Sequence, residues 1–127
     1  MRLEDQVCSL ELAKRLKELG VKQEAAFHWR YSDLLEEWSL FRPTKDVTSS
    51  KPFYAAFTVA ELGEMLPRTI LFENYFYSFR VIRALDGKWW LSYETVNKLY
   101  KEILDDSEAD ARAKMIVYLI EQGIVAV

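Results

Sequence analysis

The chain has 127 residues, of which half are hydrophobic and 29% are charged, and its formal net charge is −3. This composition is typical of a globular protein and excludes a disordered chain, and the length predicts a single domain over residues 1–127. A single cysteine, Cys8, excludes an intramolecular disulfide and a cysteine-based metal cluster. The acidic balance disfavours a nucleic-acid-binding surface.

The sequence also predicts a soluble, cytoplasmic protein without a membrane partner. Its first residues include acids and no long apolar run, which argues against a signal peptide. The longest apolar stretch, near residues 115–120, is far too short to span a bilayer.

The first 31 residues predict a helix followed by a strand. Ser9 can cap a helix over residues 9–19, because its hydroxyl accepts a hydrogen bond from a free amide of the first turn. Gly20 follows as the residue that most easily takes the left-handed conformation at a helix end. Residues 26–31 alternate between aromatic and polar side chains, which is typical of a strand.

Residues 32–51 give weaker signals. Residues 32–38 fit a helical turn, residues 38–41 fit a short strand, and residues 42–51, which include Pro43, fit an exposed loop. A second, short helix is predicted to begin at Thr58, where Thr58 and Glu61 form a capping box. Pro67 ends this helix, because the residue before a proline is pushed out of the helical region.

Residues 72–93 hold eight of the eighteen aromatic residues and predict a β-hairpin. Asp86-Gly87 suits a two-residue type I′ turn, which would place Arg83 opposite Trp90 and Arg80 opposite Tyr93. Large side chains then fall on both faces of the hairpin. One face therefore needs cover from helices of the same chain, from a partner subunit or from a ligand.

The C-terminal third predicts two helices. Apolar residues recur at helical spacing over residues 94–104, and Ser107 begins a last helix that ends at Gly123. Helices and an antiparallel hairpin without strand–helix–strand alternation predict an α+β fold. We expect one small antiparallel sheet, made of the aromatic hairpin plus one or two strands, packed by three or four helices.

Three segments resemble a family of small proteins encoded by bacteriophages, prophages and related mobile elements. They are CSLELAKRLKELGVKQEAAFHW at residues 8–29, AAFTVAELGEMLP at residues 55–67 and EADARAKMIVYLIEQGIV at residues 108–125. The resemblance implies a bacterial or phage cytoplasmic setting. It implies no activity and no catalytic residue, and it leaves out the aromatic hairpin.

The sequence offers no constellation for catalysis, a cofactor or a metal ion. His28 is the single histidine and has no partner at a spacing that suggests a metal site or a catalytic dyad, so a structural role is favoured. Cys8 precedes a helix N-terminus, where a thiol pKa can fall, but it also continues the apolar stripe of that helix, which favours burial. No phosphate-binding, dinucleotide-binding or hydrolase motif is present, so the sequence does not support an enzyme.

The favoured hypothesis is a non-enzymatic, phage-type accessory protein that binds another protein or a second copy of itself. Arg83, Trp89, Trp90 and Tyr93 are the candidate contact residues, because Trp, Tyr and Arg are enriched in interface hot spots, and Trp38 is a weaker candidate. The alternative to a contact surface is that these aromatic rings form the hydrophobic core of the domain.

The second hypothesis is a nucleic-acid-binding regulator of helix-turn-helix type. It would use the basic face of the first helix: Lys14, Arg15, Lys17 and Lys22. The second helix argues against it, because Glu61 and Glu64 would repel phosphates. A small enzyme is a third hypothesis and would need His28 or Cys8 to meet acidic residues in a cleft.

Overall fold

The structure is a computed structural model, and it describes residues 2–43 and 52–127. A short 3-10 helix, η1 (Leu3–Asp5), precedes the main elements. These are α1 (Leu10–Glu18), β1 (His28–Ser32), β2 (Glu37–Phe41), β3 (Tyr54–Ala55), α2 (Val59–Met65), β4 (Thr69–Phe72), β5 (Tyr75–Arg83), β6 (Trp89–Thr95), β7 (Lys98–Asp105) and α3 (Glu108–Glu121).

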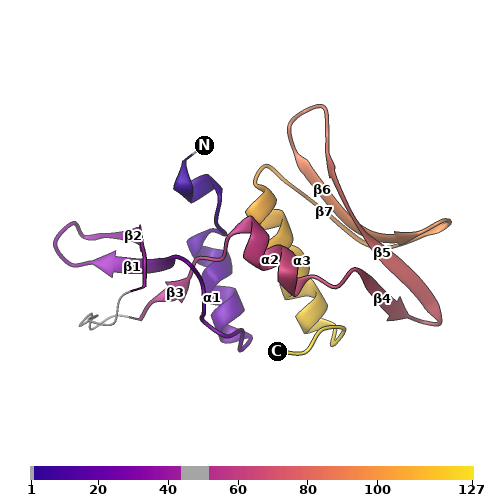
Figure 1. The fold of residues 1–127 in the computed structure, drawn as a ribbon, viewed down its shortest axis with the longest axis horizontal. Coiled ribbons are helices and arrows are strands. Elements are labelled where there is room, and N and C mark those ends of the chain that lie inside the picture. The colour runs from indigo at the N-terminus through magenta and orange to yellow at the C-terminus, as the bar shows by residue number, and fades with distance from the viewer. Residues whose placement is uncertain (1, 44–51) are drawn as a thin grey trace.

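The strands form two antiparallel sheets at opposite ends of the molecule, with the helices between them (Figure 1). One sheet has the order β2-β1-β3 and the other has the order β4-β5-β6-β7. The predicted α+β class is therefore confirmed. The prediction of one sheet is wrong, and the described residues contain three α-helices, the lower of the two numbers expected.

The capping signals in the sequence mark the helix ends correctly. The Ser9 hydroxyl accepts a hydrogen bond from the Leu12 amide, and Gly20 has a φ of 93°. Val21 N–H then donates to the Leu16 carbonyl at 3.0 Å, which closes the end of α1. Thr58 and Glu61 form the predicted capping box of α2.

The β5–β6 hairpin forms, but its turn differs from the predicted type. Ala84 N–H donates to the Lys88 carbonyl at 2.8 Å, and Gly87 N–H donates to the Ala84 carbonyl at 2.9 Å. The loop therefore has three residues, and Gly87 has a positive φ of 87° whereas Asp86 does not. This is a type I turn followed by a left-handed glycine, the usual form of a three-residue hairpin loop.

The longer loop shifts the register of the hairpin by one residue. Arg83 pairs with Trp89 and Ile82 pairs with Trp90, so the predicted pairing of Arg83 with Trp90 is wrong. Because side chains alternate between the two faces of a strand, the shift changes which residues share a face. Tyr93 likewise pairs with Phe79 and not with Arg80.

The type I′ turn predicted for Asp86-Gly87 occurs instead one hairpin earlier. Glu73 and Asn74 have φ angles of 48° and 70°, the positive values that such a turn needs. They join β4 to β5, with Phe72 paired to Tyr75. Strand β4, which the sequence analysis did not predict, therefore extends the sheet by one strand.

The helix predicted over residues 94–104 is wrong, because this segment forms the end of β6 and most of β7. Its apolar residues come as two adjacent pairs four residues apart, Leu99-Tyr100 and Ile103-Leu104. That spacing fits a helix, but in a strand each adjacent pair places one side chain on each face. Pairing with β6 decides between the two, since tertiary contacts override local propensity.

The core lies between the helices and the inner face of the four-stranded sheet. Helix α3 contacts α1, α2, β6 and β7. Its side of the core is made of small and medium residues: Ala109, Ala111, Ala113, Met115, Ile116 and Leu119. The alanines let the neighbouring helices approach closely. No helix in the described ranges is long and apolar enough to cross a membrane.

Candidate functional site

The four-stranded sheet has one face against the helices and one face turned away from them. Tyr77, Leu91 and Tyr93 point inward and are buried, and the Tyr93 hydroxyl donates to the Pro67 carbonyl at 2.6 Å. Side chains alternate along a strand, so the residues between these belong to the opposite face.

We call this opposite side the outer face of the sheet, and it carries six large apolar residues from all four strands. They are Leu71, Phe76, Ile82, Trp90, Leu99 and Leu104, and each is between 40% and 68% exposed. Single exposed apolar side chains are common on protein surfaces, whereas Ile82, Trp90 and Leu104 are paired side by side across three strands and form a patch.

Polar side chains occupy the middle of the outer face. Arg80 forms an ion pair with Glu94 across the β5–β6 pair, and the Ser92 hydroxyl also donates to Glu94 at 3.1 Å. On the β7 side, the Trp90 indole N–H donates to a Glu102 carboxylate oxygen at 3.0 Å. The outer face therefore combines apolar surface with one cation and two carboxylates, all accessible from solvent.

The four candidate residues from the sequence lie in three different environments. Trp90 is on the outer face, whereas Tyr93 is fully buried in the core. Arg83 and Trp89 lie on the inner side near the end of the hairpin, with the Arg83 guanidinium 5.4 Å from the centre of the Trp89 ring. Trp38 belongs to the other sheet, where it contacts Tyr54.

Arg83 and Trp89 line a groove of about 660 Å³ beside the first turns of α2 and α3. Each helix start already has a side-chain cap, because Glu61 N–H donates to the Thr58 hydroxyl and Asp110 N–H donates to the Ser107 hydroxyl. Carboxylates also line the groove: Asp5, Asp106 and Glu108. The groove is therefore not set up to hold an anion.

Sequence reasoning missed five of the six outer-face apolar residues. Leu71 lies on a strand that was not predicted, Leu99 and Leu104 were assigned to a helix, and Ile82 was paired in the wrong register. The sequence signal on β5 is the alternation of polar Ser78 and Arg80 with apolar Phe79 and Val81, which places Phe76 and Ile82 on the polar, exposed face.

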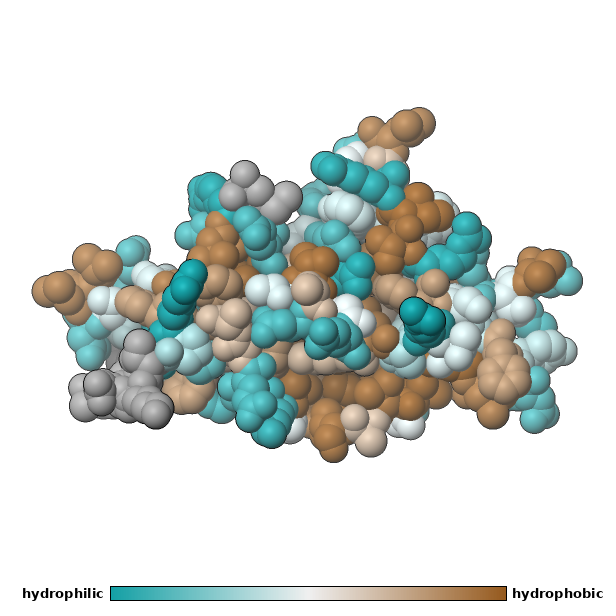
Figure 2. All heavy atoms as spheres, in the orientation of Figure 1, coloured by the Kyte–Doolittle hydropathy of each residue, from teal (hydrophilic) through white to brown (hydrophobic). Residues whose placement is uncertain are grey.

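Apolar residues also lie at three hairpin tips, but these do not form a common surface. Figure 2 shows hydrophobic atoms at the far ends of the molecule, where the tips lie. Leu34 and Leu35 are at the β1–β2 turn, Leu85 is at the β5–β6 turn and Val96 is at the β6–β7 turn. The tips point away from one another, so one flat partner cannot contact them together.

The basic face of α1 is engaged with other side chains of the chain. Lys14 lies 5.2 Å from the Trp38 ring centre, and Lys17 lies 5.1 Å from those of Phe53 and Tyr54. Arg15 forms ion pairs with Glu18 and Glu121 at 3.2 Å, and Lys22 forms one with Glu24 at 3.1 Å. The ion pairs of Arg15 and Lys22 lower the positive potential that a nucleic-acid surface would need.

His28 is buried in the three-stranded sheet and not exposed. Its ring stacks on Phe53 with the ring centres 4.6 Å apart. Burial, together with repulsion from the nearby Arg30 and Lys17 cations, lowers the His28 pKa, so the ring is neutral at physiological pH. In the described part of the chain, no group of three or more His, Cys, Asp or Glu side chains is placed to hold a metal ion.

We expect His28 to reduce the stability of the protein in mild acid. Its folded pKa lies below the unfolded value of about 6.5, so the unfolded chain binds the proton more tightly and stability is lost as the pH falls through that value. Urea unfolding of the wild type and of His28→Phe between about pH 7.5 and about pH 5.5 measures this loss of stability. The wild type should lose more stability than His28→Phe, and equal losses would show that His28 does not titrate in this way.

We expect Cys8 to be unreactive in the folded protein. The residue is fully buried, and burial raises the pKa of its thiol from 9.0 to about 12, so almost no thiolate forms at neutral pH. The predicted burial of Cys8 is confirmed. Alkylation by iodoacetamide should occur in urea but not in buffer, and labelling in buffer at the rate of a free cysteine would contradict the structure.

Comparison of the chain with protein-family models, with curated proteins and with solved structures finds no match to any of them. The outer face itself is therefore the basis for inferring a function.

Proposed function

We propose that this protein acts by binding another protein chain through the outer face of its four-stranded sheet. The observation that carries the proposal is the set of six large, exposed apolar side chains on that face. Burying about 300 Å² more of their apolar surface would contribute roughly 7 kcal/mol at about 25 cal/mol per Å², before the cost of association. Because association costs about 4 kcal/mol or more, this burial supports a weak, reversible contact.

The shape and chemistry of the outer face favour a protein partner over a small molecule or a nucleic acid. Small molecules bind in concave sites, whereas the outer face is an open sheet surface. Trp90 and Arg80 lie within it, and these residue types often provide most of the binding energy in protein interfaces. Glu94 and Glu102 on the same face would repel phosphates.

The resemblance of residues 8–29, 55–67 and 108–125 to phage and prophage proteins supplies the setting of the proposal. In that setting the protein is a non-enzymatic accessory factor in the cytoplasm of a bacterial host. Its partner is then a bacterial protein, a phage protein or a second copy of the chain.

Affinity capture from bacterial lysate, with and without nuclease treatment, tests the proposal with two matched variants. The first variant, Ile82→Thr with Leu104→Thr, makes the outer face polar with residues that suit strands. The control, Leu34→Thr with Leu35→Thr, changes exposed leucines at the β1–β2 turn. We expect the wild type and the control to retain a protein partner and the outer-face variant to lose it.

Two outcomes would contradict the proposal. Equal capture by both variants would show that the partner binds elsewhere. Loss of the captured material on nuclease treatment would support the second hypothesis, a nucleic-acid-binding protein that uses the basic face of α1.

A further inference from the structure

We infer that the occupant of the outer face is a second copy of this chain, packed face to face about a two-fold axis that runs along β6. The inference depends on the proposed function, because it names the partner of the same surface. It comes from the order of side chains across the sheet. A two-fold interface uses the same patch on both copies, so the patch must be complementary to itself.

Two neighbouring rows of the outer face carry the argument. In the first, Arg80 on β5 pairs with Ser92 on β6, and Ser92 pairs with Glu102 on β7. In the second, Ile82 on β5 pairs with Trp90 on β6, and Trp90 pairs with Leu104 on β7. The first row is thus polar with a cation at one end and an anion at the other, and the second row is apolar throughout.

A two-fold rotation about β6 keeps each row opposite the same row of the second copy. The rotation exchanges β5 with β7 and leaves β6 opposite β6, in the nearly aligned arrangement common for packed sheets. Ile82 then faces the partner's Leu104, and Trp90 faces the partner's Trp90. Apolar surface meets apolar surface along the whole second row.

The charges of the first row select this axis over its neighbours. With the axis along β6, Arg80 faces the partner's Glu102 and Glu102 faces the partner's Arg80. An axis along β5 would instead place Arg80 against the partner's Arg80, and an axis along β7 would place Glu102 against the partner's Glu102. Like charges placed opposite each other oppose association. The axis along β6 also places Glu94 opposite the partner's Glu94, but each Glu94 is ion-paired with Arg80 of its own chain. Because this axis alone forms the two Arg80–Glu102 pairs, it is favoured over its neighbours. Arg80 can keep its bond to Glu94, since a guanidinium has five donors.

The size of the outer face indicates a weak, reversible dimer. With the axis along β6, strands β5, β6 and β7 overlap with the second copy and β4 has no opposite strand. Three strands about 4.8 Å apart and about 25 Å long give a contact of roughly 360 Å² in projection. Stable interfaces bury about 800 Å² of accessible surface on each partner, so this contact is smaller than a stable interface. We therefore expect a monomer–dimer equilibrium at micromolar concentrations.

Sedimentation equilibrium of charge variants tests the inference. Over about 1–300 µM chain, the range in which a weak dimer depends on concentration, we expect the wild type to dimerise. Arg80→Glu alone and Glu102→Arg alone should each weaken the dimer at least about tenfold, because like charges then face each other. An equimolar mixture of the two single variants should form a mixed dimer, and the double variant Arg80→Glu with Glu102→Arg should dimerise again.

Arg83→Glu is the control for Arg80→Glu, because it makes the same change in net charge on the inner side of the hairpin. It should leave the dimer unchanged. Urea unfolding of each variant shows whether the fold is retained. Recovery of dimerisation in the mixture also excludes misfolding as the cause of the loss, because misfolded single variants would not form a mixed dimer.

The possible failures separate the inference from the proposed function. If the wild type stays monomeric but captures another protein through the outer face, the partner is not a second copy of the chain. That result would overturn the inference and leave the proposed function unchanged. A dimer that is insensitive to Ile82→Thr with Leu104→Thr would show that the dimer contact lies elsewhere and would overturn the inference, whereas the proposed function is judged by the capture experiment. If Arg80→Glu and Glu102→Arg each dimerise as the wild type does, or if their mixture dimerises no better than either alone, the axis does not run along β6.

Discussion

Replacement of Phe57 by alanine is expected to lower the free energy of unfolding by about 3–5 kcal/mol, the usual cost of removing a buried aromatic ring. Phe57 is fully buried and immediately precedes the Thr58 cap of α2. There it can pack against the buried Leu62 one turn into the helix, as a hydrophobic staple does. Its carbonyl also accepts the Cys8 amide at 2.9 Å, which ties the chain before α1 to the chain before α2. The loss of the ring therefore leaves a cavity where several segments meet.

Phe76→Ala is the matched control, since it removes the same ring from a residue that is 68% exposed on the outer face. We expect it to change stability by no more than about 0.5 kcal/mol, as for most surface substitutions. Urea unfolding measures the two losses of stability, with the same dependence of the unfolding free energy on urea concentration used for both variants. Similar losses for Phe57→Ala and Phe76→Ala would contradict the assignment of inner and outer surfaces.

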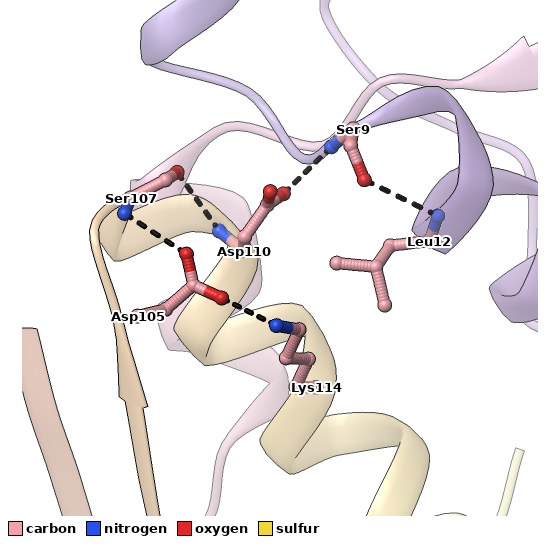
Figure 3. Close-up of polar contacts among 6 residues, drawn as sticks. All are labelled: Ser9, Leu12, Asp105, Ser107, Asp110 and Lys114. Carbon is pink, nitrogen blue, oxygen red and sulfur yellow. Dashed lines mark hydrogen bonds and ion pairs between the residues drawn. The ribbon is translucent and has the colours of Figure 1, made fainter.

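Replacement of Asp110 by alanine is expected to lower the free energy of unfolding by about 1–3 kcal/mol, the cost of leaving a partly buried donor without an acceptor. Figure 3 shows the carboxylate of Asp110, in the first turn of α3, directed at the Ser9 amide at the start of α1. The bond is 2.7 Å long and joins residues 101 positions apart. Asp110 thus connects the starting points of two helices.

Asp110→Asn separates the role of the acceptor from the role of the charge. Burial and the nearby Asp105 raise the pKa of Asp110, so its ionised form is less favoured in the folded protein than in the unfolded chain. The asparagine keeps an acceptor oxygen and removes the charge. We expect its midpoint of urea unfolding at pH 7 to stay close to that of the wild type. A loss as large as that of Asp110→Ala would show that the charge, and not the hydrogen bond, holds the two helices.

The helices could be predicted from the sequence because their ends carry local signals. Ser9, Thr58 and Ser107 each accept a hydrogen bond from an amide three residues later, and this depends on nothing outside the first turn. Strand β1 could be predicted for a similar reason, since alternation along one strand is visible without its neighbours.

The arrangement of the strands could not be predicted in the same way. The one-residue shift of the β5–β6 hairpin depends on whether Asp86 takes a positive φ, which the pair Asp86-Gly87 does not decide. Strand β7 depends on pairing with β6, because its apolar spacing also fits a helix. The predicted loop at residues 42–51 is exposed at Arg42 and Pro43, and its remainder lies outside the described residues.

The wrong register of the β5–β6 hairpin and the missed strand β7 also explain why the sequence identified only part of the candidate site. Trp90 was predicted to be a contact residue and lies on the outer face, whereas Tyr93 was placed in the same group and is fully buried. In the shifted register, the partner of Trp90 on β5 is Ile82 and not Arg83. A hydrophobic surface that crosses four strands is visible only when the register of each pair is known.

Site-specific photo-crosslinking tests most directly whether the outer face contacts protein. A photoreactive phenylalanine analogue would replace Trp90 in one form of the protein and the exposed Glu18 at the end of α1 in another, and each would be irradiated in bacterial cells. We expect a discrete crosslinked protein band from position 90 and none from position 18, and a band at twice the mass of the chain would identify the second copy. Equal labelling from both positions, or no protein adduct from position 90, would contradict the outer face as the contact surface.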